Sequence, residues 1–161
     1  NPVTVNTSSS TAVSKPIEVA YKVKESEVSD FLKELSSDEM EGRETGTKGI
    51  EKAAAFLENF LKKNHVEPYF TAYKDTLTNF KTPAYNIVGV IEGTDPVLKK
   101  EFVVLSAHYD HIGLEKKQQP DVVFNGANDD ASGVTAVAEL AKYFSETKSN
   151  KRSILFVFFA G

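Results

Sequence analysis

Apolar residues recur with helical spacing in three stretches of the chain. In residues 28–35 they fall at i, i+3, i+4 and i+7, which places them on one face of a helix that starts near Ser26. A second stripe, in residues 50–61, follows Thr47, a residue type that commonly caps a helix. The third occupies residues 134–144. We expect three helices, each with one face turned towards the core.

Three other stretches have the composition and spacing of β-strands. Residues 69–77 alternate in part, residues 85–92 are rich in Val and Ile, and residues 102–107 form an apolar run. The turn-forming residues 93–96 stand between the last two, so we expect these two strands to pair antiparallel.

A further strand is predicted at residues 154–159, where an unbroken apolar run is typical of a strand buried on both faces. Strand 102–107, helix 134–144 and strand 154–159 then predict a right-handed parallel crossover. In open α/β sheets, functional groups gather beyond the carboxyl ends of such strands. The pattern indicates an α/β fold with a mixed, mostly parallel sheet flanked by helices.

The length of 161 residues suits one compact domain. Residues 1–15 are rich in Ser, Thr and Val without periodicity, which predicts a flexible leader that follows a cleaved export signal or marks an expression boundary. Residues 16–161 are then part of a single domain. On this basis we expect an exported protein, in the periplasm, on the cell surface or secreted.

Composition excludes several classes of function. Lys and Arg alternate with Asp and Glu, and the formal charge is -4, so a nucleic-acid partner is not expected. No apolar run approaches the roughly 20 residues of a membrane span. The chain has no cysteine, which excludes disulfides, thiolate catalysis and Cys-based zinc sites and leaves His and carboxylates as metal ligands.

Candidate chemistry begins with His108 and Asp110, which follow the predicted strand 102–107. An imidazole on a rigid element can bind a metal ion, and a carboxylate two residues away can steady its other ring nitrogen. Strand alternation places both side chains on the same side. On this tripeptide alone, an ordinary strand-end histidine and a turn-forming aspartate are the favoured interpretation, and the residues that follow shift the balance.

Two adjacent acids, Asp129 and Asp130, stand before three small residues at the start of the predicted third helix. Asp130 could simply cap that helix, which accounts for one acid. A carboxylate can also bridge two metal ions about 3.5 to 4 Å apart, and small residues would let the helix approach the sheet closely enough to aim it. We assign the bridging role to Asp129.

These segments resemble the zinc-dependent aminopeptidases of the aminopeptidase S and aminopeptidase Y type, a family of co-catalytic di-zinc exopeptidases that includes glutamate carboxypeptidases. Residues 104–113 (VLSAHYDHIG) are similar to the family's first metal-ligand strand, and residues 126–133 (GANDDASG) to its bridging-aspartate motif. Residues 154–161 (ILFVFFAG) resemble the strand that follows.

Upstream segments extend the resemblance to about residues 26–161. Residues 35–43 (LSSDEMEGR) and 46–49 (GTKG) are similar to the entry into the family's first long helix, and residues 85–89 (YNIVG) to its early strand. The motifs occur in the family's order, and their intervals fit one crossover unit. The resemblance therefore implies the zinc-exopeptidase fold, which is phosphorylase/hydrolase-like.

By this resemblance, His108 would bind one zinc, Asp129 would bridge two zincs, Asp110 would orient His108, and the Asp129–Asp130 peptide bond would be cis. His111 is expected in a pocket or loop role rather than as a ligand. For Arg43, which stands among several glutamates, the residues themselves favour a solvated loop of ion pairs and leave a substrate contact open.

In the family, two glutamates follow the strand that ends here at Gly161, the first a general base and the second a zinc ligand. Residues 16–161 therefore resemble the amino-terminal part of a zinc peptidase domain that acts on peptide substrates. With His108 and Asp129 as the available ligands, we expect weak or absent zinc binding, no activity from this part alone, and self-association through uncovered apolar surface. The alternatives are a non-catalytic binding module on this fold and a glutaminyl cyclase-like acyltransferase.

Overall fold

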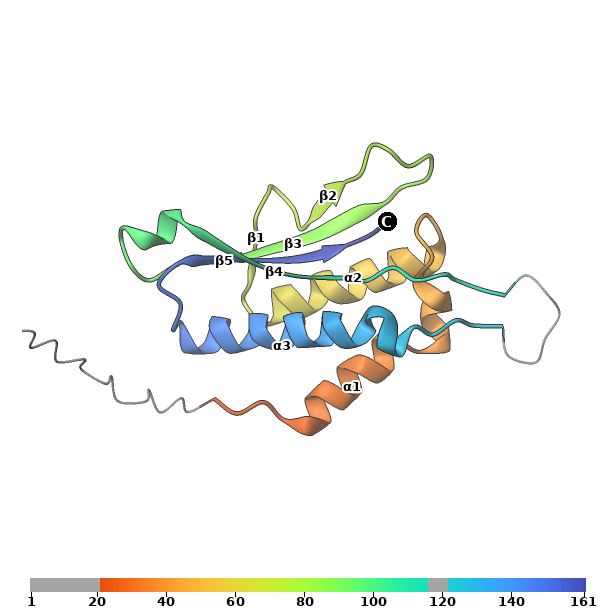
Figure 1. The fold of residues 1–161 in the computed structure, drawn as a ribbon, viewed down its shortest axis with the longest axis horizontal. Coiled ribbons are helices and arrows are strands. Elements are labelled where there is room, and N and C mark those ends of the chain that lie inside the picture. The colour runs from red at the N-terminus through yellow and green to blue at the C-terminus, as the bar shows by residue number, and fades with distance from the viewer. Residues whose placement is uncertain (1–20, 116–121) are drawn as a thin grey trace, which may run out of the picture.

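The computed structural model describes residues 21–115 and 122–161, so the predicted leader at residues 1–15 lies outside the described residues. A sheet covers one side of this part of the chain, and helices pack against it from the other (Figure 1). The helices are α1 (Glu25–Leu35), α2 (Lys48–Lys63) and α3 (Ser132–Thr147), with short helical turns η1 (Asp38–Arg43), η2 (Leu98–Lys100) and η3 (Ala127–Ala131). The strands are β1 (Glu67–Pro68), β2 (Lys74–Thr76), β3 (Tyr85–Ile91), β4 (Phe102–His108) and β5 (Ser153–Phe159).

The helices form where the apolar spacing predicts them. Every apolar residue of the predicted stripe on α2 is buried: Ile50, Ala53, Ala54, Leu57 and Leu61. Thr47 does stand at the N-cap of α2, but its hydroxyl donates back to the carbonyl of Glu44 at 2.6 Å and makes no capping bond to the helix. None of the helices in residues 21–115 and 122–161 has the length and apolarity that crossing a bilayer requires.

The order of the strands differs from the expected one. Strand β5 lies between β3 and β4, so the predicted antiparallel pairing of β3 with β4 is wrong. The apolar β5 buries more of its side chains in this central position than it could at an edge. Residues 69–77 form only the short β2, and not the longer strand that their partial alternation suggested.

The mixed α/β fold is confirmed, but the sheet is not mostly parallel in the part that the structure describes. Strand β4 pairs parallel with β5 through the crossover helix α3, as predicted. The pairings of β1 and β2 with β3, and of β3 with β5, are antiparallel. The hairpin-like segments before β3 therefore add the antiparallel half of the sheet.

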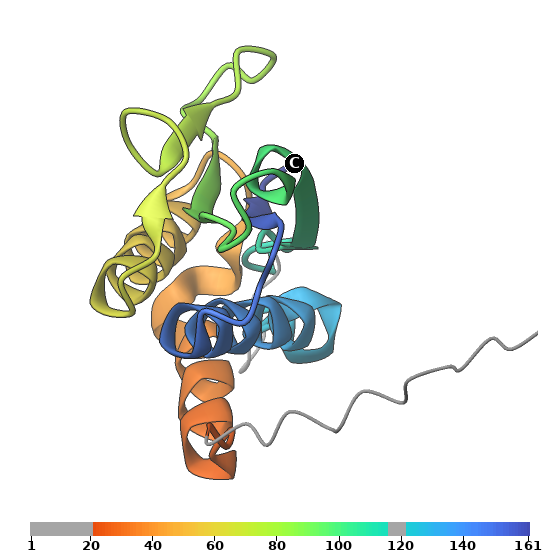
Figure 2. The same cartoon turned by 90° about the vertical axis from the view of Figure 1, so that its left-hand side faces the viewer.

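Helices α2 and α3 lie side by side on one face of the sheet, and α1 packs beyond them (Figure 2). The core between the layers contains Ile87 and Ile91 from β3 and Ile154, Phe156 and Phe158 from β5, all buried. Because alternate side chains of a strand point to opposite faces, these residues form one apolar layer against the helices.

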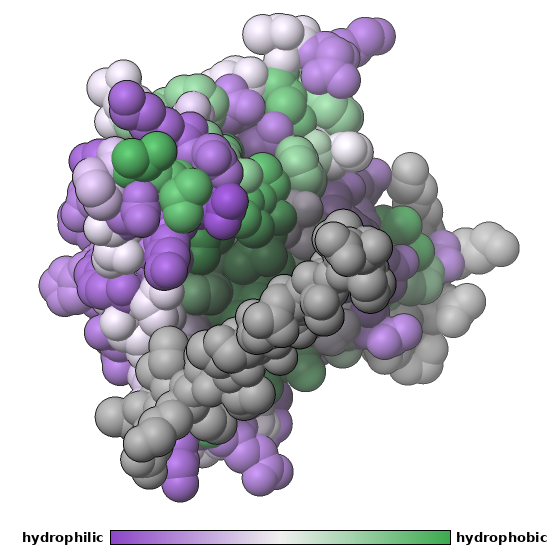
Figure 3. Space-filling view, turned by 60° about the vertical axis from the view of Figure 1, so that its left-hand side comes forward, coloured by the Kyte–Doolittle hydropathy of each residue, from purple (hydrophilic) through white to green (hydrophobic). Residues whose placement is uncertain are grey.

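Apolar side chains also gather in a hollow on the side of the molecule that Figure 3 brings forward. Between β4 and α3 lies an apolar groove of about 460 Å³, lined by Val103, Leu105, Leu140, Phe144 and Ile154 among others. Leu140, expected to face the core, is instead 40% exposed here. Leu140 lies on the side of α3 next to β4, and β4 is the edge strand of the sheet that the structure describes.

Phe156 tests the packing of the central strand. Its side chain is fully buried in β5, so Phe156→Ala should lower the free energy of unfolding by about 3 to 5 kcal/mol through lost burial and a residual cavity. Phe159→Ala on the same strand, where the side chain is 43% exposed, is the matched control and should cost clearly less. Urea unfolding followed by circular dichroism measures both, and equal losses would contradict the assigned facing of β5.

Candidate metal centre

The carboxyl end of β4 is held firmly before the chain reaches Asp110. Tyr109 is fully buried, and its backbone N–H donates to the carbonyl of Phe159 at 2.8 Å. Its hydroxyl donates to the carbonyl of Tyr85 at 2.7 Å, and burial raises the pKa of that hydroxyl above its ordinary value. Because Tyr109 is tied to β5 through its backbone and to β3 through its side chain, His108 and Asp110 project from a rigid support.

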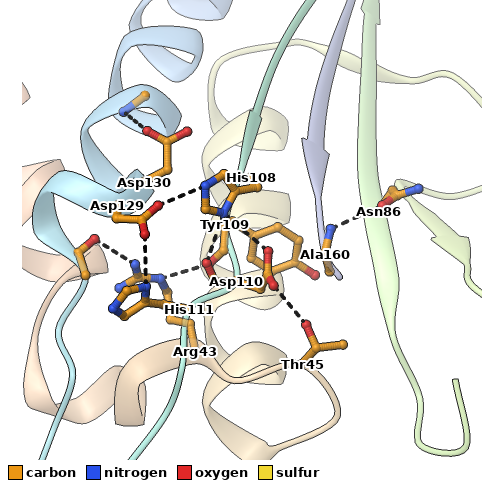
Figure 4. Close-up of polar contacts among 12 residues, drawn as sticks. Arg43, Thr45, Asn86, His108, Tyr109, Asp110, His111, Asp129, Asp130 and Ala160 are labelled. Carbon is orange, nitrogen blue, oxygen red and sulfur yellow. Dashed lines mark hydrogen bonds and ion pairs between the residues drawn. The ribbon is translucent and has the colours of Figure 1, made fainter.

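The two adjacent acids before α3 do different things. The carboxylate of Asp130 accepts the backbone N–H of Gly133 at 3.1 Å, so it caps the helix as its position suggested. Asp129 turns away from the helix towards His108 (Figure 4). The peptide bond between them is cis, as the family resemblance implied.

His108 has an acidic partner at each ring nitrogen. Nε2 lies 3.1 Å from Oδ1 of Asp129. Nδ1 lies 3.2 Å from the backbone carbonyl oxygen of Asp110 and 3.4 Å from its carboxylate. Thr45 donates its hydroxyl to the other carboxylate oxygen of Asp110 at 3.3 Å, which holds that side chain beside the ring.

The donors around His108 fit zinc in type and spacing. Zinc takes imidazole nitrogen and carboxylate oxygen, and two such ligands on one tetrahedral ion stand about 3.3 Å apart. The separation of 3.1 Å between Nε2 of His108 and Oδ1 of Asp129 is close to that value. Within residues 21–115 and 122–161, however, no group of three His, Asp or Glu residues is arranged to hold a metal ion. His108 and Asp129 therefore do not make up a complete ligand set within the described residues.

His111 lines the same corner without completing a ligand set. Its Nδ1 lies 3.9 Å from Oδ2 of Asp129, beyond direct hydrogen bonding, and its side chain is largely buried. The ring packs against Gly126, which adopts φ +58°, and a Cβ there would come within 2.6 Å of the imidazole. Gly126 therefore lets the loop before Asp129 approach His111 closely.

Arg43 is where the sequence interpretation was wrong. The solvated loop of ion pairs predicted for it does not form, because its side chain is completely buried. The guanidinium donates to four backbone carbonyls: Leu35 at 2.7 Å, Tyr109 at 2.8 Å, Asn125 at 2.6 Å and Gly126 at 2.9 Å. Burial lowers the pKa of Arg43, and the nearby carboxylates of Asp110 and Asp129 oppose that shift.

The residues around Arg43 belong to the same corner. Its own carbonyl accepts the backbone N–H of His111 at 3.0 Å, and the carbonyl of Gly42 accepts that of Gly113 at 3.0 Å. The segment entering α2 therefore runs alongside the segment leaving β4. The only signal for this in the sequence was the similarity of residues 35–43 to a family motif, which carried no role for the arginine.

Residues 86–161 match the model for peptidase family M28. This range contains β4, the adjacent acids Asp129 and Asp130, and β5. The match confirms the resemblance to zinc-dependent aminopeptidases over this part of the chain. Comparison with curated proteins found no match.

Solved structures share the fold. Glutaminyl cyclase from Porphyromonas gingivalis is 20% identical with a TM-score of 0.61, over 83% of this chain and 46% of that one. A leucine aminopeptidase precursor from Bacteroides thetaiotaomicron is 22% identical with a TM-score of 0.60, over 83% and 45%. A Zn-dependent exopeptidase from Parabacteroides distasonis is 20% identical with a TM-score of 0.59, over 83% and 45%. The chain thus spans less than half the length of these structures.

The cap on α3 separates the two acids experimentally. Asp130→Ala should lower the free energy of unfolding by about 1 kcal/mol, because the N–H of Gly133 loses its acceptor. Asp130→Asn should recover most of that loss, since asparagine caps as well as aspartate. Thermal denaturation measures both, and an Asp130→Ala protein as stable as the unsubstituted chain would refute the capping role.

Proposed function

We propose that this chain is the amino-terminal part of a zinc metallo-exopeptidase of the aminopeptidase type. The family match and the aminopeptidase and exopeptidase neighbours support a metallo-exopeptidase in general terms. The finer proposal is that His108 and Asp129 are zinc ligands and that Asp110 orients the imidazole.

The surroundings of His108 carry this proposal. A neutral imidazole has one N–H and one lone pair, whereas the groups at both of its nitrogens can only accept. If Nδ1 donates to Asp110, the lone pair of Nε2 faces a carboxylate oxygen at 3.1 Å. That arrangement requires a cation between the two atoms or a second proton on the ring. A metal ion bound by both groups satisfies it.

Each side chain then has a role. Asp110 accepts from Nδ1 and so directs the lone pair of Nε2 towards the metal position. Asp129 directs Oδ1 towards His108 and Oδ2 towards His111, so its two oxygens face different directions, as a bridging carboxylate requires. Zinc, when bound, would polarise a peptide carbonyl and lower the pKa of a water molecule.

Two ligands are fewer than the three protein ligands that a catalytic zinc ordinarily has. We therefore propose that the two-zinc site is completed by residues of a longer polypeptide, among them the glutamate base that the family resemblance implies. The 161-residue chain alone should bind zinc weakly and hydrolyse no peptide.

The metal assignment is tested in the full-length polypeptide by zinc content and by hydrolysis of aminoacyl anilides. His108→Ala and Asp129→Asn should each reduce bound zinc and lower kcat/KM by at least 100-fold, because ligand loss removes metal-dependent chemistry. Lys52→Gln, at an exposed ion pair with Glu41, is the control and should behave as the unsubstituted protein. Full activity in both ligand variants would eliminate the assignment.

A glutaminyl cyclase is the second candidate, because solved cyclases share this fold at TM-scores similar to those of the exopeptidases. The resemblance implies one zinc for a cyclase and two for the peptidase. Zinc stoichiometry, with peptides bearing amino-terminal glutamine as substrates, distinguishes them. Cyclised product and one zinc per chain would replace the peptidase proposal.

We further propose that the 161-residue chain associates with a second copy along β4. Among the described residues, β4 pairs only with β5, and its outer edge has no strand partner. Phe102, Val103 and Val104 are each about half exposed there, and the strand has no Asp, Glu, Lys or Arg to oppose pairing. An apolar edge strand without charge readily pairs with another.

Light scattering after size exclusion should therefore give a mass above that of one chain. Val104→Lys should restore the monomer, because a lysine on an edge strand opposes pairing. Val97→Lys adds the same charge at a residue that is 72% exposed outside the strands and should leave the association unchanged. A monomeric unsubstituted chain with a cooperative melt would count against this interface.

A further inference from the structure

We propose that Arg43 is a positioning residue that sets the approach of Asp129 to His108. The inference rests on the proposed metal site, because it concerns the spacing of the two residues assigned as ligands. It adds to that site a residue remote from it in sequence and completely buried.

The hydrogen bonds of one guanidinium span both sides of the site (Figure 4). Nε donates to the carbonyl of Tyr109, the residue between His108 and Asp110. Nη1 and Nη2 donate to the carbonyls of Asn125 and Gly126, which begin the turn that carries Asp129. Because a guanidinium is planar and rigid, bonds to both segments fix the distance between them.

A third attachment anchors the guanidinium itself. Nη1 also donates to the carbonyl of Leu35, the last residue of α1, where the negative end of the helix dipole favours a cation. Asn125 adds a parallel link, because its side-chain amide donates to the carboxylate of Asp38 at 2.7 Å. The turn before Asp129 is thus tied to the η1 segment twice.

The charge of Arg43 matters at the same place. Among the described residues no carboxylate forms an ion pair with the guanidinium, yet Asp110 and Asp129 are near enough to favour its charged form. The carboxylates of Asp110 and Asp129 stand on either side of the His108 ring and repel each other. The positive charge of Arg43 offsets this repulsion. Arg43 holds a left-handed backbone conformation, φ +51°, which a non-glycine residue keeps only where its surroundings demand it.

The test follows the ring nitrogens of His108 by NMR at one fixed pH, without metal and during a zinc titration. Asp129→Asn marks the ring shifts expected when the contact with Asp129 is altered. Arg43→Gln should move the metal-free shifts at least halfway towards that reference and raise the zinc concentration for half-saturation at least tenfold. Arg43→Lys, which keeps the charge but has a single ammonium, should fall between Arg43→Gln and the unsubstituted chain.

Leu57→Ala, in the fully buried face of α2, is the control for destabilisation alone and should leave the His108 shifts in place. A folded Arg43→Gln protein with unchanged shifts and zinc binding would overturn the proposal. If that variant does not fold, Arg43→Lys decides by the same criteria. If the unsubstituted chain shows no zinc response, as its incomplete ligand set allows, the metal-free shifts alone decide the role of Arg43, and the metal assignment is decided in the full-length polypeptide. Identical shifts in the unsubstituted and Asp129→Asn proteins would overturn the positioning role itself.

Discussion

The segments around His108 and Asp129 depend on the hydrogen bonds of one buried group, the guanidinium of Arg43. A buried cation is costly unless its donors are satisfied, and here four backbone carbonyls accept from it. The carbonyls gain hydrogen-bond donors in return. They lie at the end of α1 and in the irregular segments beside β4 and α3, where regular helix or sheet hydrogen bonding does not continue. One side chain thereby supplies hydrogen bonds that regular secondary structure would otherwise provide in these segments.

The parts of the fold that sequence predicts well are those governed by local periodicity. The apolar stripe of α2 and the continuous apolar run of β5 identify both elements, because burial imposes a regular spacing on each. The order of the strands in the sheet cannot be predicted from local periodicity. Nothing within residues 85–107 reveals that β5, some 50 residues later, displaces the expected pairing of β3 with β4.

The residues of the candidate site also differ in how well the sequence predicts them. His108, Asp110 and Asp129 were predicted because their residue types and intervals match a metal-ligand pattern. The structure brings all three together, and their role at a metal stays a prediction. Arg43 was not found, because a guanidinium bound to carbonyls leaves no mark on the sequence of its acceptors. Any residue has a carbonyl, whereas a ligand must be a histidine or an acid. Its neighbours Glu39, Glu41 and Glu44 suggested ion pairs that it does not make.

The long separations joined by Arg43 bear on how the chain folds. Its partners Tyr109, Asn125 and Gly126 lie 66, 82 and 83 residues away, so these bonds close large loops whose entropy must be lost first. Helices α1 and α2 can form earlier from local contacts, with the arginine still hydrated between them. The segments around His108 and Asp129 are then among the last to assemble. Burial of the guanidinium joins β4, the turn before α3 and the end of α1 into one cooperative unit.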